Sequence, residues 1–235
     1  ILLDIEGTTT PIEFVHQILF PYARARVQSF LEQHATDPGV QADVAQLHEE
    51  YAAESPREAG LPPWSAVDYV YWLMDRDRKS TSLKSLQGRI WEAGYRAGEL
   101  RGRAEVYPDV APALARWRAQ GRDIAIFSSG SVAAQRNLFA NTTAGDLTSF
   151  IRAYFDTTTG PKTAAPSYAR IAAALGRQPS HVLFLSDVGA ELDAARQAGM
   201  GTGLCVRSPE TAALSPGGGH PIIHSFNEVL PGAAP

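Results

Sequence analysis

Short apolar segments alternate with helical segments along most of the chain, and this alternation constrains the fold more than any other feature. Uninterrupted apolar runs end at Leu3, Phe127, Leu185 and Val206, and a shorter run covers 153–156. Apolar runs bounded by turns are typical of strands buried on both faces, as in a parallel sheet. The alternation therefore predicts an α/β fold whose core is a doubly wound, parallel, Rossmann-like sheet.

The segments between these runs have helical patterns that stop at glycine. They cover 110–120 before Gly121, 167–175 before Gly176, and 190–198 before Gly199. Glycine is a common residue just past the end of a helix, because it adopts the left-handed conformation there without strain. This supports the strand–helix alternation of the core.

Residues 12–105 interrupt the alternation. No strand pattern occurs there, and apolar residues recur at helical spacing in four segments, within 14–31, 40–51, 67–74 and 83–95. A crossover between parallel strands typically needs only a dozen or so residues. We therefore expect an inserted all-helical domain at 12–105, and an α/β domain built from 1–11 and 106–235.

Two features of the expected insert admit alternatives. Four aromatic residues are expected in its core: Trp64, Tyr69, Trp72 and Trp91. The alternative is that one of them lines an apolar slot for substrate. The charged run 75–79 is expected to be a solvated turn. Its alternative is a cationic contribution to the binding of an anionic substrate.

Composition excludes several classes of protein. A net charge of -4 without a clustered Lys/Arg stripe argues against a nucleic-acid partner. No apolar stretch approaches the ~18 residues that a membrane span needs, and the run 1–3 is too short for a secretory signal. The single cysteine, Cys205, cannot form an intramolecular disulfide and fits a reducing, cytoplasmic compartment as a buried thiol. The six histidines do not form the spaced pair with a central glutamate that predicts zinc.

Two acids follow the first apolar run. Asp4 and Glu6 are two residues apart, and in an extended chain such residues point to the same side. Two carboxylates in one pocket repel each other unless a cation or a proton separates them. A hard divalent ion with oxygen ligands, most simply Mg²⁺, would relieve the repulsion. A lone Asp-x-Glu is more often a pair of solvated acids, so the rest of the chain has to decide.

Polar residues also follow the later strands. Ser128 and Ser129 come after one strand and Asp187 after another, while Lys162 precedes the helix that leads to the Asp187 strand. Ligands bind at the carboxyl ends of strands in open α/β sheets. Hydroxyl and N–H donors suit a phosphate, and a lysine offsets its charge. The joint order of these residues predicts phosphoryl transfer.

The residue types allow each a role in that chemistry. Asp4 would attack phosphorus and carry the phosphoryl group as an aspartyl phosphate. Glu6 would protonate the leaving alcohol and then deprotonate the hydrolytic water. Asp187 would complete a Mg²⁺ site with Asp4 and Glu6, while Lys162 would act in catalysis and hold phosphate with the two serines.

These four segments, in this order, resemble the motifs of the haloacid dehalogenase superfamily of phosphatases. Most of those phosphatases have Asp-x-Asp where this chain has Asp-x-Glu. The helical insert is similar to the cap of that superfamily, which closes over the substrate and selects it.

The resemblance is closest to one family within it, the enolase-phosphatase E1 family of acireductone synthases. It is carried by the segments 4–13 (DIEGTTTPIE), 20–24, 74–81 and 127–131, and extends over nearly the whole chain. It implies enolisation and dephosphorylation of 2,3-diketo-5-methylthiopentyl 1-phosphate in methionine salvage, with one Mg²⁺ per chain in a monomer. It also implies the metal ligands Asp4, Glu6 and Asp187, and phosphate contacts from Ser128, Ser129 and Lys162.

Some questions stay open at the level of sequence. The base that removes the proton in enolisation is not identified: it could be Glu6 or a residue of the cap. A capped phosphatase of another small ester, such as a sugar phosphate, is the alternative enzyme. A receiver-like signalling module is a third reading, but receivers are about half this length and carry the phosphorylated aspartate mid-chain.

Overall fold

The structure is a computed structural model that describes residues 1–54, 59–78, 80–208 and 218–231. Its contacts divide the chain into two compact units, Ile1–Phe14 with Leu100–Pro235, and Val15–Glu99. The sequence patterns predict boundaries at 11/12 and 105/106, which differ from these positions by three and six residues. Lys79 of the charged run and most of the glycine-rich segment after Ser208 lie outside the described residues.

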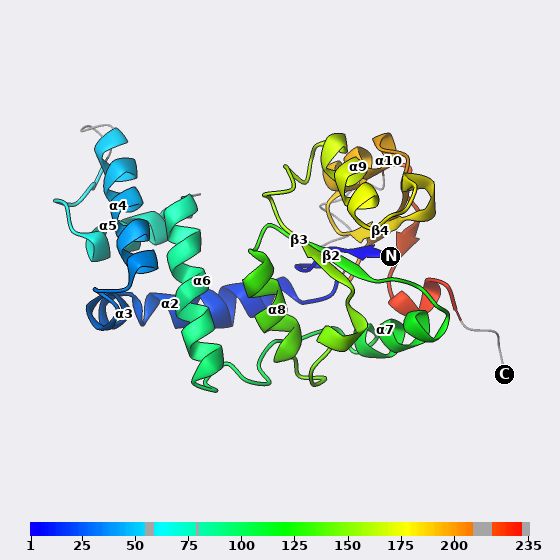
Figure 1. The fold of residues 1–235 in the computed structure, drawn as a ribbon, viewed down its shortest axis with the longest axis horizontal. Helices are drawn as coiled ribbons and strands as arrows, with labels where there is room; N and C mark the ends of the chain where they lie inside the picture. Colours follow the sequence, from blue (N-terminus) through cyan, green and yellow to red (C-terminus); the bar gives the residue numbers. More distant parts are fainter. Residues whose placement is uncertain (55–58, 79, 209–217, 232–235) are drawn as a thin grey trace. The chain divides into compact units, whose positions relative to one another are not determined.

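The first unit contains a six-stranded, wholly parallel sheet in the order β3-β2-β1-β4-β5-β6 (Figure 1). The strands are β1 (Leu2–Leu3), β2 (Ala125–Phe127), β3 (Ala153–Phe155), β4 (Leu183–Ser186), β5 (Gly201–Cys205) and β6 (Ile222–Ile223). The chain adds β2 and β3 on one side of β1, and then β4, β5 and β6 on the other side. β1 is therefore central, between β2 and β4. The predicted doubly wound α/β core is confirmed.

Four helices of the first unit connect these strands. They are α7 (Val110–Ala119), α8 (Val132–Ala140), α9 (Ala165–Ala174) and α10 (Gly189–Gln197). Figure 1 shows α9 and α10 on one side of the sheet and α7 on the other. Apolar side chains of α9 and α10 form one buried cluster with those of the strands, including Tyr168, Leu192, Phe127 and Phe184. This packing fixes the strand ends from which the site is built.

The strands are shorter than the apolar runs that predict them. The run that starts at Asp123 forms a ladder only from Ala125. Asp123 itself pairs with Arg152 and Arg177 near the surface, so it precedes the sheet. The expected last element, 222–230, is the two-residue strand β6 followed by the 3-10 helix η4 (Phe226–Glu228).

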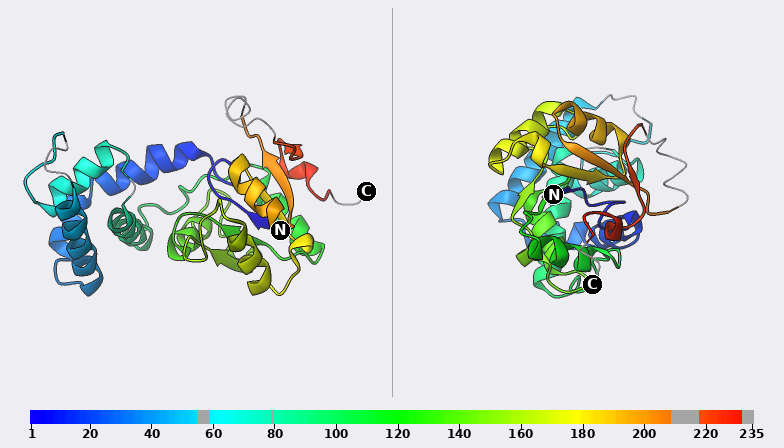
Figure 2. Two further views of the ribbon diagram at one scale, coloured as in Figure 1. Left: turned by 90° about the horizontal axis from the view of Figure 1, so that it is seen from above. Right: turned by 90° about the vertical axis from the view of Figure 1, so that its right-hand side faces the viewer.

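Among its described residues, the second unit consists of helices joined by turns and loops and contains no strand (Figure 2). Its elements are a π-helix, η1 (Val15–Leu19), and the helices α2 (Phe20–Arg24), α3 (Val27–Gln33), α4 (Pro38–Ala53), α5 (Ala66–Asp75) and α6 (Thr81–Arg96). A short helix, α1 (Ile12–Phe14), precedes them in the first unit. The expected helix at 14–31 is thus broken into pieces, one of which begins around Pro21, where proline lacks the N–H that continues a helix.

Capping side chains explain where the longer helices of this unit begin. The Asp37 carboxylate accepts hydrogen bonds from the N–H groups of Gly39 and Val40 at the start of α4. Ser65 and Ser80 accept hydrogen bonds in the same way at the starts of α5 and α6. Each side-chain cap satisfies a backbone donor that the helix itself leaves unpaired.

The aromatic residues of the second unit differ in exposure. Tyr69 and Trp72 are buried and stack at 5.7 Å between ring centroids, and Trp91 is half-buried and donates to the Leu19 carbonyl. Trp64 is 38% exposed and is not a core residue. It lies against the rings of His48 and Tyr51 at the surface, so aromatic character alone did not predict its burial.

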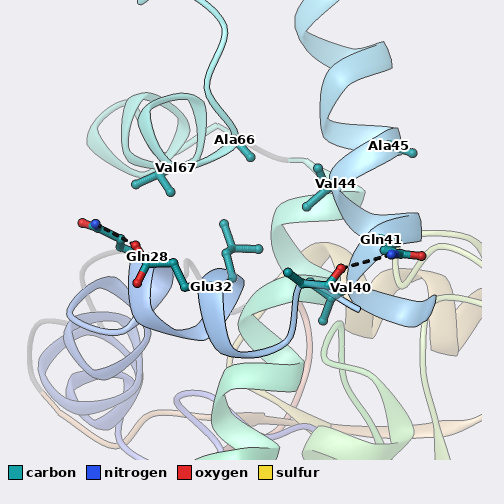
Figure 3. A pocket seen from close by; sticks show the side chains of 10 residues that line it. Gln28, Glu32, Val40, Gln41, Val44, Ala45, Ala66 and Val67 are labelled. Atoms are coloured by element: carbon teal, nitrogen blue, oxygen red, sulfur yellow. Dashed lines mark hydrogen bonds between the residues drawn. The ribbon is translucent and has the colours of Figure 1, made fainter. Parts of the chain in front are cut away.

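A cavity of about 490 Å³ opens between α3, α4 and α5 (Figure 3). Its walls are largely aliphatic, with Leu31, Val40, Val44 and Val67 among them, and Gln28 bonds Glu32 at its side. Glu32 is the one ionisable side chain among its lining residues, and none of them is a cation.

Candidate active site

Three of the predicted site residues follow adjacent strands of the sheet. Asp4 follows β1, Ser128 follows β2 and Asp187 follows β4. Because these strands are parallel neighbours, their carboxyl ends meet at one edge of the sheet. The Asp4 N–H continues the ladder by bonding the Leu185 carbonyl at 3.0 Å.

Lys162 reaches Asp4 from the loop before α9. Its ammonium donates to Oδ1 of Asp4 at 2.5 Å and to Oε2 of Glu191 at 2.8 Å. The loop is held in place because the Tyr168 hydroxyl donates to the Lys162 carbonyl at 2.6 Å and Ser167 to the Pro161 carbonyl at 2.7 Å. Two of the residues that the sequence assigned to the site are therefore in direct contact.

Glu191 and Ser186 complete this cluster. The Ser186 hydroxyl lies 3.1 Å from Glu191 Oε2 and 3.4 Å from Asp4 Oδ2. From the sequence, Glu191 is grouped with Asp187 after the same strand but has no predicted role, because an acid in the first turn of a helix is often there to complement the helix dipole. Its position five residues after Ser186, on the first turn of α10, was the available signal. Asp193 on the same helix is exposed and pairs with Arg196.

The cluster has unusual electrostatics because it is buried. Burial alone would lower the pKa of Lys162, but the facing carboxylates of Asp4 and Glu191 offset it, so the pKa is raised. Burial, and then the charge of Asp4, raises the pKa of Glu191 to about 7. The same two causes raise the pKa of Asp187 to about 7. Three acids, Asp4, Asp187 and Glu191, share this site with one lysine, so a further positive charge would stabilise their ionised forms.

Asp187 lies against the turn that follows the acid pair. A Cβ added to Gly7 would come within 2.1 Å of Asp187 Oδ2, and Gly7 has a φ of 70°, which favours glycine. Glu6 is half-buried, and its backbone pairs with Thr10 across this turn. Glycine thus allows the carboxylate of Asp187 to approach the backbone beside Glu6.

The two serines after β2 differ in exposure. Ser128 is 1% exposed, and its hydroxyl accepts a hydrogen bond from the Gly130 N–H at 3.2 Å. Ser129 is exposed. The buried Gln135 side chain donates to the carbonyls of Gly130 and Phe155, both at 2.8 Å, and so ties this turn to the end of β3.

The donor set was compared with what Mg²⁺ requires. No group of three or more His, Cys, Asp or Glu side chains in the described part of the chain is arranged to hold a metal ion. Mg²⁺ needs fewer, since it commonly takes one or two carboxylates and completes its shell with water and substrate phosphate. Asp4 and Asp187 supply hard oxygen donors, and burial, followed by the charge of Asp4, raises the pKa of Asp187. These residues fit such an ion.

Two further observations concern the single cysteine and the described helices. Cys205 is buried, and burial raises the pKa of its thiol to about 12, so it is a core residue. Among the described helices, none combines the length and the apolar character that a bilayer span requires.

Comparison with protein families gives a match at residues 1–199 to the haloacid dehalogenase-like hydrolases. Curated relatives match nearly the whole chain. Enolase-phosphatase E1 of Synechococcus elongatus is 54% identical and covers 97% of this chain and 96% of its own. Enolase-phosphatase E1 of Azotobacter vinelandii is 46% identical and covers 99% and 97%.

Solved structures give the same fold. The UTR4 protein of Saccharomyces cerevisiae has a TM-score of 0.75 and 36% identity, covering 97% of this chain and 98% of its own. CbbY of Rhodobacter sphaeroides, solved in complex with phosphate, has a TM-score of 0.61 and 16% identity, covering 98% and 95%, which shows the fold alone. With the buried Asp–Lys–Glu cluster at the sheet edge, these matches identify the chain as a phosphatase that belongs to the enolase-phosphatase E1 family of haloacid dehalogenase-like hydrolases.

Proposed function

We propose that the chain enolises 2,3-diketo-5-methylthiopentyl 1-phosphate and then dephosphorylates it, in methionine salvage, to 1,2-dihydroxy-3-keto-5-methylthiopentene and phosphate. The observation that carries the phosphatase half is the contact of 2.5 Å between Lys162 and the buried Asp4. The choice of substrate is supported by relatives that share about half of their residues with this chain over nearly its full length.

Asp4 is proposed as the nucleophile. Lys162 would orient its carboxylate and would offset negative charge when an anionic phosphate approaches. An oxygen of Asp4 would bond to phosphorus as the bond from phosphorus to the leaving alcohol breaks, which gives an aspartyl phosphate. Water would then attack phosphorus and return the Asp4 carboxylate.

Glu6 is proposed as the acid and the base. It would donate a proton to the departing alcohol oxygen and later take one from the attacking water, so its proton is restored in each cycle. The turn at Gly7 places it two residues beyond Asp4 at the same strand end. Ser128, Ser129 and Lys162 would hold the other phosphate oxygens.

Asp4, Glu6 and Asp187 are the proposed holders of one Mg²⁺ per chain. When bound, such an ion supplies positive charge to the phosphoryl group and favours the ionised form of Asp4 and Asp187. The helical second unit is proposed as the cap that selects the substrate, and the chain as a cytoplasmic monomer. Size-exclusion chromatography with light scattering checks the last point.

The substrate is tested by following both half-reactions together. We expect the ultraviolet absorbance of the diketone phosphate to change as the enol forms, and free phosphate to appear with it. Sugar phosphates should be turned over far more slowly. Fast hydrolysis of a sugar phosphate with none of the diketone phosphate would overturn the substrate and favour the alternative capped phosphatase.

A further inference from the structure

Arg207 lies immediately outside the catalytic cluster and has no role in the proposed chemistry. We infer that it is a positioning residue, which fixes the loop that carries Glu6 by binding the carbonyl of Thr8. The inference rests on the proposed function of Glu6 as acid and base.

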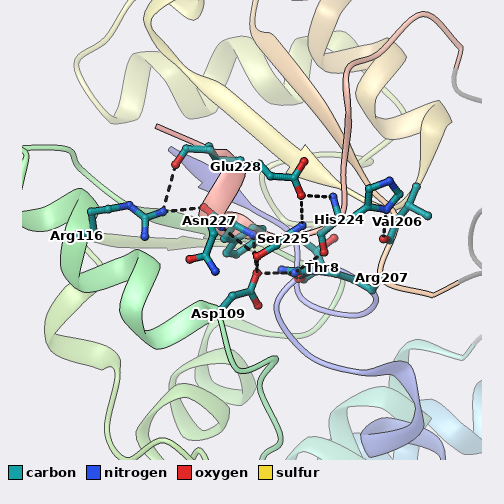
Figure 4. A network of polar contacts seen from close by, with 11 residues as sticks. Thr8, Asp109, Arg116, Val206, Arg207, His224, Ser225, Asn227 and Glu228 are labelled. Carbon is teal, nitrogen blue, oxygen red and sulfur yellow. Dashed lines mark hydrogen bonds and ion pairs between the residues drawn. The ribbon is translucent and has the colours of Figure 1, made fainter. Parts of the chain in front are cut away.

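The guanidinium of Arg207 binds the Thr8 carbonyl, the Asp109 carboxylate and, at 3.3 Å, the His224 carbonyl (Figure 4). Its Nε and Nη2 donate to the Thr8 carbonyl at 3.0 and 2.7 Å, and its Nη1 pairs with Asp109 Oδ2 at 2.6 Å. The side chain is only 4% exposed. A planar fork can make these contacts together, whereas an ammonium, as a point charge, cannot reproduce them.

Neighbouring groups hold the fork in place. The guanidinium carbon lies 4.6 Å from the ring centroid of Tyr107 and 4.4 Å from that of Phe226. Asp109 also accepts hydrogen bonds from the Ser225 hydroxyl at 2.9 Å and from the Phe226 N–H at 2.5 Å. Arg207 is therefore anchored to the start of α7 and to η4 before it reaches the loop.

The loop depends on such anchorage more than Asp4 does. Asp4 is fixed by its ladder bond to Leu185 and by Lys162 and Ser186. Beyond it, the Ile5 carbonyl accepts from the N–H groups of the next three threonines, which folds the loop on itself.

Two contacts tie this folded loop to the rest of the first unit through its outward carbonyls. Arg207 binds the carbonyl of Thr8, and the Tyr107 N–H binds that of Thr9 at 3.0 Å. Thr8 is two residues from Glu6. Loss of the hydrogen bonds from the Arg207 guanidinium to the Thr8 carbonyl should therefore displace Glu6 and leave Asp4 in place.

This difference predicts which phosphate esters should be hydrolysed more slowly when Glu6 is displaced. Glu6 gives its proton to the leaving oxygen as that oxygen parts from phosphorus, and an alkoxide needs this proton while p-nitrophenolate does not. Any change at the proposed metal site would affect both esters alike, so displacing Glu6 should slow the hydrolysis of an alkyl phosphate more than that of p-nitrophenyl phosphate.

The test compares kcat/KM for these two esters in Arg207→Lys. We expect the alkyl phosphate to lose about tenfold more than the aryl phosphate, a part of the 10²–10⁴-fold that a positioned acid contributes. Both esters are assayed on one preparation, so a reduced fraction of folded protein cancels in the ratio. Equal losses on the two esters would overturn the inference.

Arg116→Lys is the matched control. Arg116 also binds the C-terminal segment, donating to the carbonyls of Phe226, Val229 and Leu230 at 2.7, 3.3 and 3.4 Å, and none of these acceptors lies in the Thr8 loop. Its ratio should stay at the native value. If Arg207→Lys yields no folded protein, Asp109→Asn, which removes the charge that orients the guanidinium, should give the same unequal losses, and equal losses there would overturn the inference.

Glu6→Gln separates this inference from the proposed function. It should show the same selective loss on the alkyl ester, and adding Arg207→Lys to it should cause no further selective loss. If Glu6→Gln loses equally on both esters, the proposed role of Glu6 fails and the inference with it. If Glu6→Gln is selective but Arg207→Lys is not, only the inference fails.

Discussion

The Lys162 ammonium lies 2.5 Å from the Asp4 carboxylate, although 158 positions separate the two residues in the chain. Its other contact, at 2.8 Å, is with Glu191. One buried cation thus neutralises part of the charge of two acids, and it lies where an incoming phosphate would add more negative charge. This arrangement makes Lys162 central to both the stability and the chemistry of the site.

Replacing Lys162 with methionine tests both contributions. We expect turnover to fall by about 10²–10³-fold or more, as when a preorganised charge-stabilising donor is lost. The free energy of unfolding should fall by about 3 kcal/mol, because two carboxylates stay buried without their cation. Phosphate-release kinetics and urea titration measure these effects, and near-native turnover would remove Lys162 from the site.

Glu191 gives a prediction about pH. Its pKa is raised from 4.5 to about 7 by burial and then by the Asp4 charge. The folded state therefore binds more protons than the unfolded state between these values, so stability is fully present below about pH 4.5 and declines as the pH rises through about 7.

We expect Glu191→Gln, which cannot ionise, to gain stability relative to the native chain over this pH range when both are free of metal. Urea titrations in EDTA at several pH values measure the difference. A difference that does not depend on pH would show that Glu191 ionises normally in the folded protein.

Gly7→Ala tests the close approach of Asp187. The new Cβ would meet Asp187 Oδ2 at 2.1 Å, and a φ of 70° adds strain. We expect loss of about 1–2 kcal/mol of stability from the backbone and loss of most phosphatase activity from the displaced carboxylate.

Gly176→Ala is the matched control, because Gly176 has a similar φ of 66° but an added Cβ there would meet nothing within 4 Å. It should lose stability and keep its activity. If both variants lose activity alike, the contact between Gly7 and Asp187 is unimportant for catalysis.

Asp187→Asn tests the proposed metal site. Removal of one negatively charged oxygen donor from the proposed set of Asp4, Glu6 and Asp187 should weaken Mg²⁺ binding by at least about tenfold, measured by calorimetry as well as by the Mg²⁺ dependence of activity. Asp193→Asn, a change of an exposed acid on α10, should bind Mg²⁺ as the native chain does. EDTA should silence the native enzyme and Mg²⁺ should restore it; activity that resists chelation would rule out the metal.

The sequence predicted the parallel sheet because strands buried on both faces leave continuous apolar runs, such as the run that ends at Phe127. It also predicted that Asp4 and Lys162 would meet, because residues that follow parallel strands gather at one edge of the sheet. Strand ends were less predictable, because a strand is hydrogen-bonded only where a neighbouring strand lies beside it. The run that starts at Asp123 is therefore paired with β3 only from Ala125.

Other features had no distinctive pattern in the sequence. Glu191 has an ordinary position at a helix start, and only the folded chain shows its contact with Lys162. Arg207 acts on a backbone carbonyl, which every residue possesses, so nothing in the type of Thr8 marks it as a partner. Trp64 is exposed because its neighbours cover one part of the ring and leave the rest in solvent.

The central claim is that Asp4 takes up the phosphoryl group, and acid quenching during turnover tests it most directly. Glu6→Gln, mixed with a radiolabelled phosphate ester and quenched in acid, should accumulate label on the peptide that contains Asp4, because the water that attacks the intermediate lacks its base. Label on that peptide, absent when Asp4 is also changed to Asn, is the predicted result. Release of labelled phosphate with no label on the Asp4 peptide at any quench time would contradict the account.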